Sequence, residues 1–273
     1  MFSCNKAFAW YGGKTHIVGR LLRLMPADYD VFVEVFGGGA ALLLHKPKKG
    51  IEVYNDINTE LVEMFKCIKD KTTFKDFLIR AYLNLYSRSF YVEYKRIYKQ
   101  VKDPVERASM FYFLSLVSPN HTGYGFARVK NQVNRNMPAS VAKYRNMLNN
   151  LINMHNRLKD VIIENASFEC IIEKYDSHKT FFYMDPPYLS DTRVKKNIYK
   201  YEMSLSQHKT LIEMLKSVKD KVMLSGYDNP LYNELNWNKV VIKHPKSATV
   251  INNNNSSRSV KFEVVWLNYD LFS

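Results

Sequence analysis

Apolar runs alternate with amphipathic segments over the first 65 residues, which predicts alternating strands and helices. A β-branched run over 30–35 ends in three glycines and passes into an apolar helix over 40–44. A second run, over 50–54, ends at Asn55 and Asp56, and apolar residues at spacings of three and four then predict a helix. Because strands that end in glycine or polar turns are typical of nucleotide-binding sheets, this segment predicts part of a Rossmann-like sheet.

The middle of the chain has a helical pattern. Apolar spacing predicts helices over 74–86 and 91–101, and a further helix over 144–158 that leads back to the sheet. Between them, residues 110–117 form an apolar stretch. Polar residues dominate 118–138, so we expect a loop there.

The last third of the chain returns to alternating strands and helices. The strands that we expect are 161–163, 181–184, 222–225, 240–243 and 260–268. Ser204 and Gln207 form the pattern of a capping box, which predicts the start of a helix. An Asn- and Ser-rich segment, 252–257, predicts a hairpin loop between the last two strands.

Composition excludes several classes of protein. With 46% hydrophobic and 24% charged residues, the chain can bury a core, so we do not expect disorder as its main state. No run approaches the ~18 apolar residues of a membrane helix, and the N-terminal pattern is not that of a secretory signal. Three cysteines are too few for a disulfide framework or a tetrahedral zinc site. We therefore expect an intracellular protein with no membrane segment and no metal.

Positive charge is concentrated in the middle of the chain. The formal net charge is +14, and residues 66–160 hold 18 Lys and Arg against 6 Asp and Glu. A solvated helical face is the ordinary explanation of a charged run. Aromatic residues from Tyr82 to Tyr98 are interleaved with this charge, and several of their rings are expected in a local core. We interpret the segment as a subdomain that faces nucleic acid.

The sequence Asp185-Pro186-Pro187-Tyr188 directly follows an apolar strand. Two prolines force an extended turn without backbone donors, so a carboxylate and carbonyl oxygens face the carboxyl edge of the sheet. Asp185 and the Pro186 carbonyl can accept hydrogen bonds from a planar amino group, and Tyr188 can stack on the attached ring. A purely structural turn at the end of a strand is the alternative.

Two earlier segments add features of a cofactor pocket. Trp10-Tyr11-Gly12-Gly13-Lys14 combines aromatic rings, flexible backbone and a cation, although a surface turn would also have this composition. Glu34 and Phe36 precede glycines 37–39, and Asp56 ends the second strand, where a carboxylate can bind ribose hydroxyls. The glycines lack the GxGxxG spacing, so we expect a nucleoside-containing cofactor rather than a dinucleotide.

The order of these three motifs resembles that of the Dam-like, class alpha, D12 family of N6-adenine DNA methyltransferases. The resemblance covers most of the chain and implies an α/β fold, with a Rossmann-like S-adenosylmethionine-dependent methyltransferase sheet and an inserted, mainly helical target-recognition domain. It implies a catalytic domain in two parts: residues 1–65 with the cofactor site, and residues 161–273 with the Asp-Pro-Pro-Tyr motif. Residues 66–160 would form the inserted domain that recognises double-stranded DNA.

The same resemblance implies roles for individual residues. The implied cofactor-binding residues are Trp10, Tyr11, Lys14, Glu34, Phe36, Gly37, Asp56, Phe168 and Asp185. The implied catalytic residues are Asp185, Pro186 and Tyr188, which would hold an adenine flipped out of the duplex. The DNA-binding candidates are Tyr124, Arg128, Lys130 and Arg135. A phosphate contact and a base contact are equally compatible with Arg128.

The sequence departs from the family pattern in places, and related kinds of DNA methylation use similar residues, so the recognition sequence and the target base have alternatives. Val35 and Ala9 stand where the family often has proline and lysine, and residues 120–128 match the recognition hairpin only in part, so a GATC site is not implied. C5-cytosine methylation is excluded, because it uses a cysteine that usually follows proline and this chain has no Pro-Cys pair. N4-cytosine methylation and an inactive DNA-binding subunit remain alternatives.

The resemblance also implies a bacterial or phage-encoded, cytoplasmic protein. A cognate restriction endonuclease is a further partner that the family allows.

Overall fold

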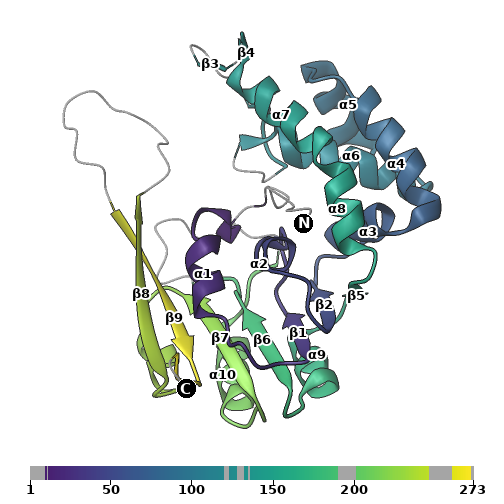
Figure 1. Ribbon diagram of the computed structural model, residues 1–273. Helices are drawn as coiled ribbons and strands as arrows, with labels where there is room; N and C mark the ends of the chain where they lie inside the picture. The colour runs from purple at the N-terminus through teal and green to yellow at the C-terminus, as the bar shows by residue number, and fades with distance from the viewer. Residues whose placement is uncertain are drawn as a thin grey trace, which may run out of the picture.

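The structure is a computed structural model that describes residues 10, 12–119, 123–127, 132–134, 136–189, 201–245 and 260–271. Its centre is a seven-stranded sheet with the strand order β5-β2-β1-β6-β7-β9-β8 (Figure 1). The strands are β1 (Val31–Glu34), β2 (Ile51–Asn55), β5 (Ile162–Glu164), β6 (Thr180–Met184), β7 (Lys221–Gly226), β8 (Asn238–Pro245) and β9 (Val260–Leu267). The prediction of an α/β sheet with strands from both ends of the chain is confirmed.

The first five strands of this order are parallel, and β9 is antiparallel to both β7 and β8. β1 lies between β2 and β6, with Val31 opposite Ile51 on one side and opposite Thr180 on the other. After β1, the chain first adds β2 and β5 on one side of it and then adds β6 and β7 on the other side, so the strand order reverses at β1. Residues that follow β1, β2 and β6 therefore meet at one edge of the sheet, which is where open α/β sheets bind ligands.

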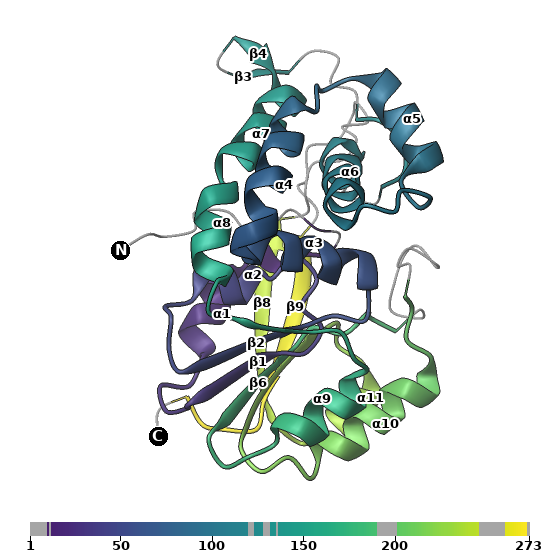
Figure 2. The ribbon, with the colours of Figure 1, turned by 90° about the vertical axis from the view of Figure 1, so that its right-hand side faces the viewer.

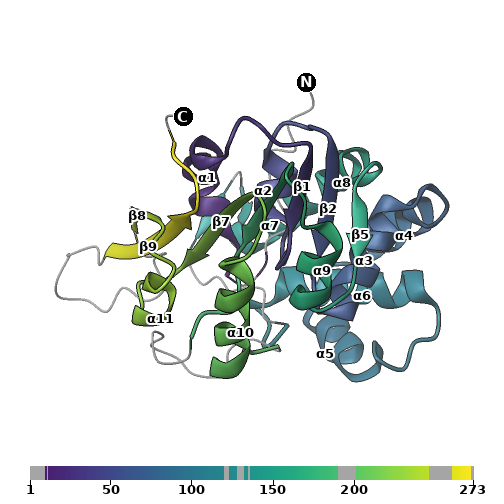
Figure 3. The same ribbon diagram turned by 90° about the horizontal axis from the view of Figure 1, so that it is seen from below.

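Helices cover both faces of the sheet (Figure 3). Helices α1 (Val18–Leu24) and α2 (Ala41–His45) lie on one face, and α9 (Phe168–Tyr175), α10 (Leu205–Leu215) and α11 (Pro230–Asn233) lie on the other. Successive strand residues point to opposite faces. Phe32 and Phe181 pack in the apolar cluster that includes α1 and α2, while Val33 and Phe182 pack in the cluster that includes α9 and α10.

Among the described residues, the segment between β2 and β5 is helical apart from one short hairpin. Its helices are α3 (Thr59–Lys69), α4 (Lys71–Leu83), α5 (Arg88–Ile97), α6 (Pro104–Val117), α7 (Ala139–Asn149) and α8 (Leu151–Leu158), and its hairpin is β3 (Val133–Asn134) with β4 (Met137–Pro138). Helix α6 is buried along most of its length and packs against α3, α4 and α5. Figure 2 shows these helices gathered on the side of the carboxyl ends of the sheet strands.

A buried group of charges joins this helical segment to the sheet. Arg157 of α8 donates hydrogen bonds to Glu52 of β2, at 2.8 Å, and to the Leu43 carbonyl of α2, at 2.7 Å. Lys46 pairs with the same Glu52 carboxylate. Because a buried carboxylate is costly without partners, Arg157 fixes the position of α8 against β2, and Lys46 ties the end of α2 to the same carboxylate.

The structure differs from the predicted elements in several places. The single helix expected over 144–158 is two helices, α7 and α8, which meet at Asn150, where two consecutive asparagines favour local turns over a continuous helix. The predicted loop over 118–138 contains the β3–β4 hairpin. The capping box of Ser204 and Gln207 is confirmed at the start of α10. The predicted hairpin loop over 252–257 lies outside the described residues.

Helices α1 and α9 were not predicted, because short helices offer few repeats of the apolar spacing. None of the helices in the described part of the chain is both long and apolar enough to cross a membrane.

Candidate active site

A cavity opens at the carboxyl ends of β1, β2 and β6, where the strand order reverses. Its volume, including the open mouth, is about 830 Å³. Seven of the predicted cofactor-site residues line it: Trp10, Lys14, Glu34, Phe36, Gly37, Asp56 and Asp185. The fold therefore brings together motifs that are far apart in the sequence.

Asp185 and Lys14 form an ion pair in the cavity wall, in which Lys14 is buried and Asp185 is 17% exposed. Asp185 directly follows β6, and Lys14 begins a single helical turn, η1 (Lys14–His16), after the two glycines. Lys14 Nζ lies 2.7 Å from Asp185 Oδ2 and donates a hydrogen bond to the Gly12 carbonyl at 3.2 Å. Burial raises the pKa of the Asp185 carboxyl to about 6, although Lys14 opposes the rise. The other carboxyl oxygen, Oδ1, is buried and accepts no hydrogen bond of ordinary geometry from the described residues. The nearby Tyr188 hydroxyl also acts to lower the Asp185 pKa.

Tyr188 lies behind this pair rather than in the cavity wall. Its side chain is only 7% exposed, and it is Pro187 that lines the cavity. The Tyr188 ring has Lys14 Nζ at 4.9 Å from its centroid and meets the Tyr227 ring edge-on at 4.6 Å. Pro186 is buried. The turn therefore aims Asp185 at the cavity and packs Tyr188 against Lys14.

Glu34 ends β1 and is buried beside the start of α2. Its Oε2 atom accepts a hydrogen bond from the Leu43 amide at 3.0 Å. Burial raises the pKa of Glu34 to about 8, against the effect of hydrogen bonds from the Leu42 and Leu43 amides. A buried carboxyl of this kind is a strong hydrogen-bonding group at the cavity wall.

Asp56 joins the glycine loop to the end of β2. Its two oxygens accept hydrogen bonds from the amides of Gly38 and Asn58, each at 2.8 Å. Burial raises the pKa of Asp56. Gly38 has a positive φ of 48°, a conformation that favours glycine. Because each carboxylate oxygen can accept more than one hydrogen bond, Asp56 can still accept hydroxyl donors from the cavity.

Aromatic rings form the apolar part of the site. Trp10 and Phe36 line the cavity, and the Trp10 ring lies 5.9 Å from the Phe111 ring of α6. Phe168 does not line the cavity, since it is buried at the start of α9 with its ring 5.8 Å from that of Phe36. It supports Phe36 from behind.

The predicted DNA-binding residues lie apart from the cavity or outside the described residues. Arg128, Lys130 and Arg135 are outside the described part of the chain, as is Tyr11 of the predicted cofactor site. Tyr124 is 72% exposed, and the Lys95 ammonium lies 4.1 Å from its ring centroid.

Other residues at the site were missed by the sequence analysis. Tyr183 lines the cavity and lies two residues before Asp185, so strand alternation could have identified it. Asn58 and Tyr201 also line the cavity, and the sequence has no comparable signal for them. Glu263 Oε2 lies 3.9 Å from Lys14 Nζ, and its only signal is its position as a carboxylate in the apolar strand β9.

Comparisons with known proteins agree with this geometry. The model of the D12 class N6 adenine-specific DNA methyltransferase family matches residues 10–252. The type II methyltransferase M.CviBI of Paramecium bursaria Chlorella virus NC1A is 29% identical over 218 residues, which cover 79% of this chain and 80% of that protein. The type II methyltransferase M1.LlaDCHI of Lactococcus lactis subsp. cremoris is 29% identical over 287 residues, which cover 95% of this chain and 94% of that protein. A third, M.MjaIII of Methanocaldococcus jannaschii, is 29% identical and covers 86% of this chain. Since the family model spans nearly the whole chain, the protein belongs to the D12 class N6 adenine-specific DNA methyltransferase family.

Proposed function

We propose that the protein methylates the N6 amino group of adenine in double-stranded DNA at a specific sequence, with S-adenosylmethionine as the methyl donor. Family membership supports the reaction class. The observation that carries the proposal is Asp185, a carboxylate only 17% exposed at the cavity, with one oxygen on Lys14 and the other accepting no hydrogen bond of ordinary geometry from the described residues.

The residues of the cavity fit an aminoacyl nucleoside. Asp56 lies at the end of β2 with oxygens able to accept ribose hydroxyls, and Phe36 and Trp10 offer apolar surface for a base. Lys14 supplies a cation for a carboxylate group. S-adenosylmethionine, when bound, supplies a methyl group on a sulfonium centre. The chain itself contributes positioning and charge, since amine methylation needs no covalent enzyme intermediate.

Asp185, Pro186 and Tyr188 would hold the target base. The free Asp185 oxygen and the Pro186 carbonyl can accept the two N–H groups of the adenine amine, which turns the nitrogen lone pair away from both acceptors. The amine is not accessible for this chemistry within a stacked base pair, so the adenine would be flipped out of the duplex. Because the Tyr188 ring is buried between Lys14 and Tyr227, we expect this ring to move towards the cavity when the base stacks on it.

We further propose that residues 66–160 form the target-recognition domain, between the two parts of the catalytic domain at 1–65 and 161–273. Helix α5 and residues 123–127 carry a surface of cations and rings, in which Lys95 lies over Tyr124 and Arg88 lies 5.0 Å from the Phe126 centroid. Such a surface supports binding to phosphates. Arg128, Lys130 and Arg135 follow it in the sequence and remain our candidates for DNA contacts.

Nucleoside mass spectrometry tests this proposal. The full-length protein is incubated with S-adenosylmethionine and unmethylated genomic DNA, and the product is also read by modification-aware sequencing. We expect N6-methyladenine in a single sequence context. N4-methylcytosine would keep the mechanism but overturn the substrate base, and the absence of any modified base would favour an inactive DNA-binding subunit. Because the relatives above are type II methyltransferases by name, we include a cognate restriction endonuclease in the proposal.

A further inference from the structure

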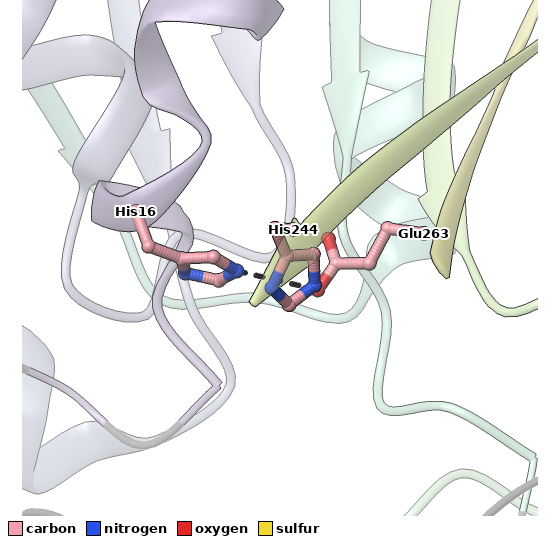
Figure 4. Close-up of side chains that lie close together, drawn as sticks. All are labelled: His16, His244 and Glu263. Atoms are coloured by element: carbon pink, nitrogen blue, oxygen red, sulfur yellow. Dashed lines mark ion pairs between the residues drawn. The ribbon is translucent and has the colours of Figure 1, made fainter. Parts of the chain in front are cut away.

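A second cluster of polar side chains lies next to Lys14, outside the set of residues that line the cavity. His16 of η1, His244 of β8 and Glu263 of β9 face one another (Figure 4), and none of the three lines the cavity. One ligand atom from each residue lies within 4.8 Å of those of the other two. The side chains of His244 and Glu263 are 9% and 6% exposed, whereas that of His16 is 43% exposed. The cluster is therefore buried on one side and open to solvent on the other.

The distances within this cluster are longer than those of direct hydrogen bonds, and the His16 and His244 ring centroids lie 4.4 Å apart, an arrangement that leaves room for a shared ion. The Nε2 atoms of His16 and His244 lie 3.7 and 3.6 Å from the same Glu263 oxygen, Oε1. Hydrogen bonds between such groups are usually about 2.7–3.2 Å long. Two ligand atoms bound to one tetrahedral zinc ion at their usual distances are about 3.4 Å apart. Both separations are close to this value.

The charges around Glu263 also favour a cation. The Lys14 ammonium is 2.7 Å from Asp185 and 3.9 Å from Glu263, so one cation faces two buried carboxylates and lies closer to Asp185. Glu263 Oε2 accepts no hydrogen bond from the described residues. A buried carboxylate without full compensation is costly. A cation on the Oε1 side would balance Glu263 and leave the Lys14–Asp185 pair intact.

We propose that His16, His244 and Glu263 bind one divalent transition-metal ion of the zinc type. Imidazole nitrogens and a carboxylate oxygen are ordinary zinc ligands, and the exposed side at His16 leaves a fourth position for water. Magnesium and calcium are disfavoured, because both prefer oxygen ligands throughout. The expectation of no metal rested on the cysteines. It missed this cluster because His16 and His244 lie at opposite ends of the chain and form no local spacing motif.

Such an ion would join two parts of the fold that are distant in sequence. His16 precedes α1, while His244 and Glu263 belong to the paired strands of the β8–β9 hairpin, near the register pair His244–Lys261. Arg20 of α1 already donates a hydrogen bond to the Lys243 carbonyl at the same contact. The bound ion would add a second link there, so its expected effect is to stabilise the folded protein.

Zinc binding by the full-length protein tests this proposal. After dialysis against a chelator, isothermal titration with Zn²⁺ should show one ion per chain, and Zn²⁺ should raise the midpoint of thermal unfolding. His16→Asn and His244→Asn should each weaken binding by about tenfold or more, as loss of a ligand requires, and should abolish the thermal shift. His16→Asn is the safer variant, because its side chain is partly exposed and its loss is least disruptive to folding.

Two matched controls separate this site from adventitious binding. His178→Asn removes an exposed histidine and Cys170→Ser removes an exposed thiol, and both should bind Zn²⁺ like the wild type. Co²⁺ should give the strong visible absorption of tetrahedral coordination in the wild type and not in His244→Asn. Absence of Zn²⁺ binding, binding by His16→Asn and His244→Asn equal to that of the wild type, or loss of binding in a control variant would overturn the proposal. No readout depends on methyl transfer.

Discussion

The ion pair of Asp185 and Lys14 sets the charges that the cavity presents. Asp185, with a pKa of about 6, is mainly ionised at neutral pH. Burial acts to lower the pKa of Lys14, but the carboxylates of Asp185 and Glu263 outweigh this effect, so its pKa is raised and the ammonium stays charged. The Asp185 carboxylate, which can accept hydrogen bonds from the target amine, and the Lys14 ammonium, which can bind the carboxylate of the cofactor, thus lie side by side in the cavity wall.

The ionisation of Asp185 predicts an acidic limb in the pH profile of methyl transfer. The carboxylate accepts amine hydrogens only when deprotonated, so kcat/KM should fall about tenfold per pH unit below the pKa. Because kcat/KM reports the free enzyme, the midpoint should lie near pH 6. Initial rates between pH 5 and 8 measure this limb. A constant kcat/KM over that range would show that the protonation of Asp185 does not matter.

Replacement of Lys14 predicts weaker cofactor binding. Hydrogen bonds to charged groups contribute about 1.5–3 kcal/mol, so Lys14→Ala should raise the Kd of S-adenosylmethionine at least tenfold. It should also move the acidic limb to higher pH, since the variant lacks the cation that lowers the Asp185 pKa. Isothermal titration measures the Kd, and Lys209→Ala on the exposed face of α10 is the matched control. An unchanged Kd in Lys14→Ala would disprove the role.

At the level of residues, sequence motifs predicted most of the cavity wall. Glycine, proline and acidic residues immediately after apolar runs mark strand ends, and parallel strands bring those ends together. Phe168 was placed at the cofactor and instead supports Phe36, because an aromatic residue next to a strand end has the same pattern in both positions. Glu263 and His244 were missed, because their partners come from the N-terminal segment and no local spacing reveals that contact.

At the level of elements, the glycine loop after β1 is held by close packing against β2. A Cβ atom on Gly37 would lie 2.2 Å from the Tyr54 ring and 2.7 Å from the Asn55 carbonyl oxygen. The Gly37 amide donates a hydrogen bond to that carbonyl at 2.7 Å, and Tyr54 donates to the Gly38 carbonyl at 2.8 Å. The absence of a side chain at Gly37 thus lets the loop approach β2.

Gly37→Ala should therefore distort the loop and destabilise the protein. Crowding of this kind costs about 1–3 kcal/mol, and the displaced loop should also weaken S-adenosylmethionine binding. Gly19→Ala is the matched control, since a Cβ there meets nothing within 4 Å and Gly19 lies in helix α1. Urea unfolding of both variants measures the difference. Equal stability of Gly37→Ala and Gly19→Ala would contradict the packing argument.

The elements themselves were predicted where periodicity was long or caps were explicit. Helices α3, α4, α5 and α10 repeat the apolar spacing over several turns, and Ser204 with Gln207 marks the start of α10. Helix α6 was expected only as an apolar stretch over 110–117, because it is buried along most of its length and lacks a polar face. The break at Asn150 was not predicted, because the apolar spacing continues from α7 into α8 while the backbone turns. The β3–β4 hairpin was missed, because two-residue strands have no measurable alternation.

At the level of the whole molecule, charge and chemistry belong to different parts of the chain. The segment 66–160 carries most of the net positive charge, while the cavity is built mainly from the two flanking parts. Arg80, Arg107 and Arg157 of that segment are paired with carboxylates within the protein. The exposed cations of α5 are therefore better candidates for the DNA surface than these arginines.

Removal of two α5 cations should weaken DNA binding without affecting the cofactor site. The double variant of Arg88→Ala and Lys95→Ala should lower DNA affinity and reduce the slope of log K against log salt by about 1 for each phosphate that it no longer neutralises. Its Kd for S-adenosylmethionine should equal that of the wild type. Fluorescence anisotropy at several salt concentrations measures the slope, with Lys209→Ala as the control. An unchanged salt slope would place the DNA surface elsewhere.

The most direct test of the proposed mechanism is single-turnover methyl transfer to DNA by Asp185→Ala, beside the wild type. Binding of DNA and S-adenosylmethionine is measured on the same preparations, so that loss of transfer can be separated from loss of folding or binding. We expect the wild type to label adenine and Asp185→Ala to bind DNA with little change but transfer no detectable methyl group. Transfer by Asp185→Ala at a rate near that of the wild type would contradict the assignment of Asp185 as the residue that holds the target amine.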